Sequence, residues 1–84
     1  MHLKDFIKLQ FLAVVEEQLS KNDPPETTAT FHRLIHQGYS EEQAKTLISA
    51  CVSAELIDAI GTGVIANHTR YIQNLQRLPE LPEA

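Results

Sequence analysis

NDPPETTATFHRLIHQGYSEEQA, residues 22–44, decides the fold, because it contains the signals for two helix starts and for the helix end between them. The first start lies at the two prolines. Asp23 is expected to be the N-cap. Pro24 is expected in the first turn, where N–H groups have no intrahelical acceptor and the missing N–H of proline costs nothing. Glu26 stands at the position that completes a capping box. A helix is therefore predicted over residues 24–37.

Gly38 follows directly, and glycine is the residue that most often takes the left-handed conformation just past a helix end. Ser40 then provides the next N-cap, with Gln43 three residues later as its capping-box partner. Because so few residues separate the two helices, the segment predicts a tight helical corner.

The rest of the chain shows helical spacing of apolar residues and no long alternation of the kind that marks a strand. Asn67 is the expected cap of the last helix, and the prolines of the final segment exclude further helix. The expected fold class is all-α, a single domain forming a compact bundle of about four helices, with a long apolar third helix at its centre. The predicted helices cover residues 3–20, 24–37, 41–60 and 67–77, and the tail 79–84 is predicted to be extended.

The first predicted helix is apolar on two sides, which is typical of a central helix or of one that contacts a second subunit. One stripe is expected to pack on the third helix and consists of Leu3, Phe6, Ile7, Ala13 and Val14. The other stripe then faces outward and consists of Leu12, Val15 and Leu19. Burying such side chains against a second copy contributes about 1.5–3 kcal/mol each, against association costs of similar total size. The sequence therefore predicts a homodimer through this second stripe, with coverage by helices of the same chain as the alternative.

Composition narrows the possible partners. The 84 residues carry a net charge of −4 and contain no basic run, which argues against nucleic acid, since affinity for it comes largely from Lys and Arg. The longest apolar run near the N-terminus, residues 11–15, is far shorter than the ~20 residues that span a bilayer, so no membrane association is expected. The lone Cys51 excludes an intrachain disulfide, which fits a cytoplasmic protein.

His32 and His36 are spaced so that two imidazoles on one helical face can share a metal ion. The pattern between them does not match the HExxH motif of metalloproteases, because Arg33 and Leu34 occupy the intervening positions. Two ligands do not complete a site, and histidines that only face solvent or pack on a neighbour show the same spacing. The pair is therefore a candidate metal site with a structural alternative.

Glu55 and Asp58 fall on the apolar side of the third predicted helix. A carboxylate buried without a partner is strongly destabilising, so these residues need an explanation. The sequence leaves three alternatives open: an ion pair with Arg or Lys, a metal ion shared by carboxylates, or exposure where the helix extends beyond the core. Glu16, on the first helix, is the further carboxylate that could meet them across a helix interface.

No set of residues predicts catalysis. Cys51 lies in the middle of a helix on its apolar face, where a thiol is normally inert packing. The glycines of residues 61–63 follow a helix and lack the lysine of a phosphate-binding loop, so they are expected to end the helix. We therefore expect no enzymatic activity and no cofactor.

Several short pieces occur in a distinctive order: V-E-E-Q-L (15–19), D-P-P-E (23–26), R-L-x-x-x-G-Y-S-E (33–41), A-x-x-L-I (44–48), A-E (54–55), R-Y (70–71) and L-P-E-L-P (78–82). Together they resemble a family of small bacterial all-helical proteins of uncharacterised function. The resemblance implies histidines at the positions that are Lys8, Leu12, Glu42 and Thr46 here, and a glutamate matching Glu16. In the family such a set would suggest a metal site, but this chain keeps only the carboxylates, and the resemblance implies no activity.

Two functions are compatible with these observations. The favoured one is a non-enzymatic protein-interaction or oligomerisation module, with a second copy or an unidentified protein as partner. The alternative is a metal-binding protein that uses His32 and His36, or the carboxylates of Glu16 and Glu55.

Overall fold

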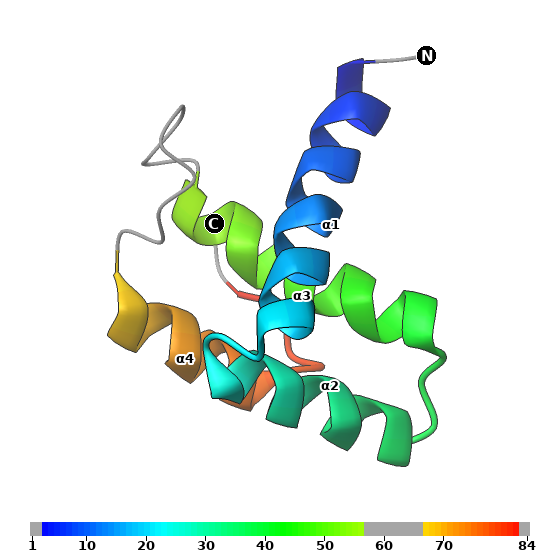
Figure 1. The fold of residues 1–84 in the computed structure, drawn as a ribbon, viewed down its shortest axis with the longest axis vertical. Coiled ribbons are helices and arrows are strands. Elements are labelled where there is room, and N and C mark those ends of the chain that lie inside the picture. Colours follow the sequence, from blue (N-terminus) through cyan, green and yellow to red (C-terminus); the bar gives the residue numbers. More distant parts are fainter. Residues whose placement is uncertain (1–2, 57–66, 83–84) are drawn as a thin grey trace.

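The structure is a computed structural model that describes residues 3–56 and 67–82. It contains four helices, α1 (Leu3–Lys21), α2 (Pro25–His36), α3 (Glu41–Leu56) and α4 (His68–Arg77), and no strand in the described residues (Figure 1). The predicted all-α bundle is confirmed.

The third helix contacts each of the other three helices, while α1 packs against α3 and α2. The prediction of an unusually long third helix is not confirmed, because α1 has 19 residues and α3 has 16 in the described range. Residues 57–60, which the sequence assigned to this helix, lie outside the described residues, as does Asp58. In Figure 1 the amino-terminal part of α1 extends well beyond α2, α3 and α4.

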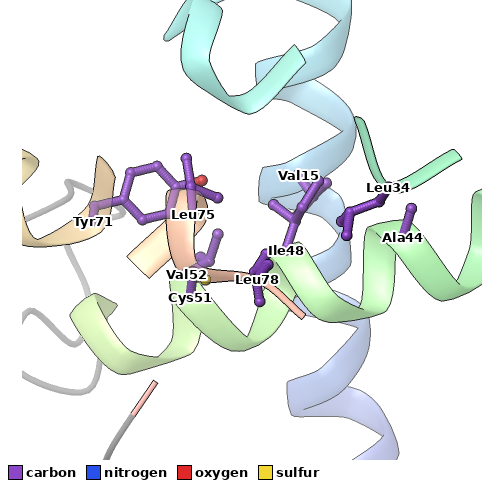
Figure 2. Close-up of a cluster of buried hydrophobic side chains, with 9 residues drawn as sticks. All are labelled: Val15, Leu34, Ala44, Ile48, Cys51, Val52, Tyr71, Leu75 and Leu78. Carbon is purple, nitrogen blue, oxygen red and sulfur yellow. The ribbon is translucent and has the colours of Figure 1, made fainter. Parts of the chain in front are cut away.

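The core lies where the four helices meet (Figure 2). Four of its residues come from one face of α3, with the spacing expected of a helix buried along one side. The others come from α1, α2, α4 and the turn after α4. The complete set of buried apolar residues is Val15, Leu34, Ala44, Ile48, Cys51, Val52, Tyr71, Leu75 and Leu78.

The corner between α2 and α3 forms as its sequence predicts. Gly38 has φ +104°, and its N–H donates to the carbonyl of Ile35, while the Tyr39 N–H donates to the carbonyl of Leu34. These two bonds define a Schellman ending. The capping box of α3 is also present: the Gln43 N–H donates to Ser40 Oγ at 3.1 Å, and the Ser40 N–H donates to Gln43 Oε1 at 2.9 Å.

The start of α2 differs from its prediction. Pro24 is the N-cap and Pro25 the first helical residue, with no side-chain capping bond. The Asp23 N–H instead donates to the carbonyl of Gln18, which ties the turn to the end of α1. Asp23 is therefore not the N-cap, because two consecutive prolines move the first helical residue one position later than expected.

At α4 the predicted cap is confirmed, since Asn67 Oδ1 accepts from the Arg70 N–H at 3.0 Å. The tail does not become extended at once: the Glu80 N–H donates to the carbonyl of Arg77 and closes a turn. Leu78 lies in this turn and is buried. Within the described part of the chain, no helix has the length and apolar character needed to cross a membrane.

Candidate functional site

His32 and His36 lie one turn apart on α2, and both are exposed. They border a shallow cleft together with Arg33 and Gln37. In residues 3–56 and 67–82, no group of three or more His, Cys, Asp or Glu side chains lies close enough to hold a metal ion. The pair therefore offers two accessible nitrogen ligands, and the other ligands of a metal ion would have to come from water or a second molecule.

Glu55 is fully buried and forms a bidentate ion pair with Arg70 of α4. Arg70 Nε donates to Glu55 Oε2 at 2.6 Å, and its Nη2 donates to Oε1 at 3.0 Å. Of the three alternatives that the sequence left open for this carboxylate, the ion pair is the one observed. The pair joins α3 to α4, so its immediate role is structural.

Glu16 does not meet Glu55. Its carboxylate pairs with Lys45 of α3 at 2.6 Å, and 59% of its side chain is exposed. The expectation of a buried carboxylate at this position is wrong, because Glu16 lies beside the core-facing side of α1 and reaches along the surface to a lysine. A metal ion shared by Glu16 and Glu55 is not supported, since each carboxylate already faces a cation.

Lys45 also lies over the ring of Phe31, 5.9 Å from its centroid. Around these residues, α1, α2 and α3 enclose an open cleft of about 380 Å³. The hydroxyl of Thr28 is buried on its wall and has no hydrogen-bond partner among the residues that the structure describes. The cleft combines apolar surface from Leu19 and Phe31 with carboxylates, a lysine and this unused hydroxyl.

A polar network that the sequence did not indicate joins three helices. Tyr71 of α4 donates its hydroxyl to Gln18 Oε1 at 2.7 Å, and Thr27 of α2 donates to the same oxygen at 2.8 Å. Burial raises the pKa of Tyr71 to about 12, although the hydrogen bonds with Thr27 and Gln18 act to lower it. Nothing in the sequence marked Thr27 as buried, because it stands among polar residues and threonine is compatible with either environment.

Arg33 makes a contact between helices that the sequence did not indicate. Its guanidinium donates to the carbonyls of Leu78 at 2.7 Å and Leu75 at 2.9 Å. These carbonyls lie at the end of α4, where helical C=O groups lack intrahelical partners. Arg33 therefore holds the end of α4 against α2.

Cys51 is the expected inert thiol. It is fully buried in the core, and burial raises its pKa to about 12. A thiol that stays protonated throughout the physiological range is neither a nucleophile nor a ready metal ligand.

The apolar residues of α1 are arranged differently from the prediction. Val15 is fully buried, Leu19 packs on the core, and Leu12 is half-buried. Val14, from the stripe expected to pack on the third helix, also packs on the core, so residues of both stripes face inward, and the placement of Val15 on a dimer surface is wrong. Both stripes have helical spacing, so periodicity could not decide which one packs.

The exposed apolar surface of α1 lies nearer its amino-terminal end. Lys8, Leu9 and Gln10 are all exposed, and among residues 8–21 the first that packs on the core is Phe11. Leu9 keeps 52% of its surface in solvent.

No family model, curated protein or solved structure matches this chain. The resemblance to small bacterial helical proteins therefore stays a prediction.

Proposed function

We propose that the protein is a non-enzymatic protein-interaction module that self-associates as a homodimer through the amino-terminal part of α1. The observation that carries this proposal is the exposure of Leu9, which keeps 52% of its surface in solvent on a helix whose amino-terminal part extends beyond α2, α3 and α4 in Figure 1. A helical segment that extends beyond the core is stabilised little by packing within its own chain. A contact with another molecule would supply that packing.

The ionic and polar groups described above support the same conclusion. Glu55, Arg33 and Tyr71 each hold helices of this chain together. Cys51 is buried with a raised pKa. Glutamate, arginine, tyrosine and cysteine side chains can take part in catalysis, but the contacts of these four residues stabilise the fold. The lone thiol also fits action in the cytoplasm.

The apolar contribution to a dimer is modest. Full burial of a leucine contributes about 1.5–3 kcal/mol, so burying the remaining exposed half of Leu9 and part of Leu12 in both copies contributes about 3–6 kcal/mol. Association costs about 4–15 kcal/mol. The charged residues beside these leucines must therefore take part, and the expected dimer is weak.

Light scattering over a concentration series tests the proposal. The mass should rise from 9.4 kDa towards twice that value as protein is added. Leu9→Glu should keep the monomer mass at all concentrations while the helical circular dichroism spectrum is unchanged. Leu81→Glu is the matched control, since Leu81 is equally exposed, at 58%, and lies in the tail. A constant monomer mass for the wild-type chain, or equal effects of the two substitutions, rejects the proposal.

A metal-binding function is the second candidate, and the exposure of both His32 and His36 on one helical face favours it. Titration calorimetry with zinc, nickel and iron should show binding at or below micromolar affinity that disappears in the double variant His32→Ala, His36→Ala. Identical heats for the wild type and this variant reject the histidine site.

A further inference from the structure

The outer face of α2 carries a row of exposed residues, none of which has a charged side chain. The row consists of Pro25, Ala29, His32 and His36. Beside it, Arg33 is the charged neighbour, but its guanidinium donates to two carbonyls at the end of α4. Its charge is therefore directed at the end of that helix and not at the imidazoles, and the row is open to a metal ion.

The ring of His32 is partly fixed before any metal binds. Phe31 and His32 meet edge to face, with ring centroids 5.7 Å apart and an interplanar angle of 67°. This contact reduces the side-chain freedom that His32 loses on binding a metal ion. His36 lies one turn further along the same face, the spacing at which two helical histidines share a zinc ion.

This inference rests on the metal-binding function given above as the second candidate. We propose that the metal is zinc and that it joins two copies of the chain, with His32 and His36 of each copy as its four ligands. A structural zinc ion is tetrahedral and takes four protein ligands. Residues 3–56 and 67–82 contain no group of three or more ligands, so two histidines from each copy complete the set. The two-fold axis then passes through the metal ion.

Charge explains why this pairing depends on the metal. Each chain has a net charge of −4, so two copies repel each other. The row on α2 lacks acidic residues, and a divalent cation held there offsets part of the repulsion. Without zinc, we expect no contact through α2.

Tetrahedral coordination also fixes how the two helices cross. The two nitrogens of one copy form one edge of the tetrahedron, and this edge follows the axis of α2 because the histidines are one turn apart. Opposite edges of a tetrahedron are perpendicular, so the two α2 helices cross at about 90°. Contact between the copies is then confined to the metal ion and the residues beside it, among them the half-exposed Ile35.

Light scattering with and without zinc tests the pairing, using the Leu9→Glu chain so that the contact proposed for α1 does not contribute. Zinc should raise the mass from 9.4 kDa to twice that value, and a chelator should reverse the change. Calorimetry should give one zinc ion for two chains. His32→Ala and His36→Ala should each abolish the increase in mass with the helical circular dichroism spectrum unchanged. His68→Ala is the matched control, since His68 is also exposed but lies at the start of α4, and it should pair like the parent chain.

Cobalt(II) in place of zinc reports the geometry. Four imidazoles around the ion should give the strong visible absorption of a tetrahedral site, whereas two imidazoles completed by water give the weak absorption of an octahedral one. Strong absorption should appear with the same stoichiometry as the increase in mass. Weak absorption at that stoichiometry overturns the four-histidine site.

The metal-binding function and the pairing fail separately. If zinc produces no heat that depends on His32 and His36, the histidine site itself is rejected. If one zinc ion binds each chain and the mass stays at 9.4 kDa, the histidine site stands and the pairing is overturned. An increase in mass that persists in His32→Ala, or that is lost in His68→Ala, also overturns it.

Discussion

The ion pair between Glu55 and Arg70 leads to a prediction opposite to the one that the exposure of the two residues alone would give. Glu55 is fully buried, whereas 49% of the Arg70 side chain is exposed. Substitution of the more buried residue is usually the more damaging change. Here we expect the reverse: Arg70→Met should destabilise the fold more than Glu55→Leu.

The reason is what each substitution leaves behind. Arg70→Met leaves a carboxylate buried without its cation, which costs about 3–5 kcal/mol. Glu55→Leu leaves a guanidinium that water can solvate. It removes charged hydrogen bonds contributing about 1.5–3 kcal/mol, and the new apolar side chain offsets this by about 1.5–3 kcal/mol. The expected net change in the free energy of unfolding lies within about 1.5 kcal/mol of zero in either direction.

Urea unfolding followed by far-ultraviolet circular dichroism at pH 7 measures both free energies of unfolding. Arg77→Met is the matched control, because Arg77 is a similarly exposed arginine of α4 whose partner, Glu80, is also exposed. Its effect should stay within about 0.5 kcal/mol of the wild type. If Glu55→Leu proves more damaging than Arg70→Met, the reasoning from the buried carboxylate is refuted.

Three further predictions follow from the core, the corner and the polar network. Val15→Ala should lower the free energy of unfolding by about 1.5–2.5 kcal/mol, since two methyl groups leave a filled core, while Leu9→Ala should change it little; equal effects in urea unfolding would contradict the assignment. Gly38→Ala should cost about 1–2 kcal/mol from backbone conformation alone, because φ is +104° and the added Cβ meets no atom within 4 Å; a neutral result in the same assay would argue against it. Tyr71 is expected to lose its proton near 10.0 when unfolded and at about 12 when folded, so stability should fall as pH rises through this window. In Tyr71→Phe the free energy of unfolding should fall less steeply between pH 10 and 12 than in the wild type. An unchanged dependence on pH would show that the phenol does not contribute.

Local signals predicted the helices of this protein well. The capping box of Ser40 and Gln43, the left-handed Gly38 and the Asn67 cap each depend on residues within one turn. Such contacts can be predicted from the sequence because no distant partner is needed. The exception is the start of α2, where Pro24 was expected in the first turn but is the N-cap, and Pro25 is the first helical residue.

Contacts between helices could not be predicted in the same way. Glu55 was recognised as a carboxylate that needs a partner, but the sequence could not choose Arg70 from several cations. Arg33 was noted only as a residue that breaks the HExxH pattern, and its bonds to the end of α4 depend on how two helices pack. The two stripes of α1 were equally regular, so only packing shows that Val15 faces inward.

Amide hydrogen exchange at low and high protein concentration tests the central claim most directly. If the amino-terminal part of α1 is the contact surface, the amides of residues 8–13 should become more protected as concentration rises. Those of α4, whose residues the proposed contact does not include, should not change. Exchange rates in residues 8–13 that are independent of concentration, or protection that appears in α4 instead, would contradict an interaction through this helix.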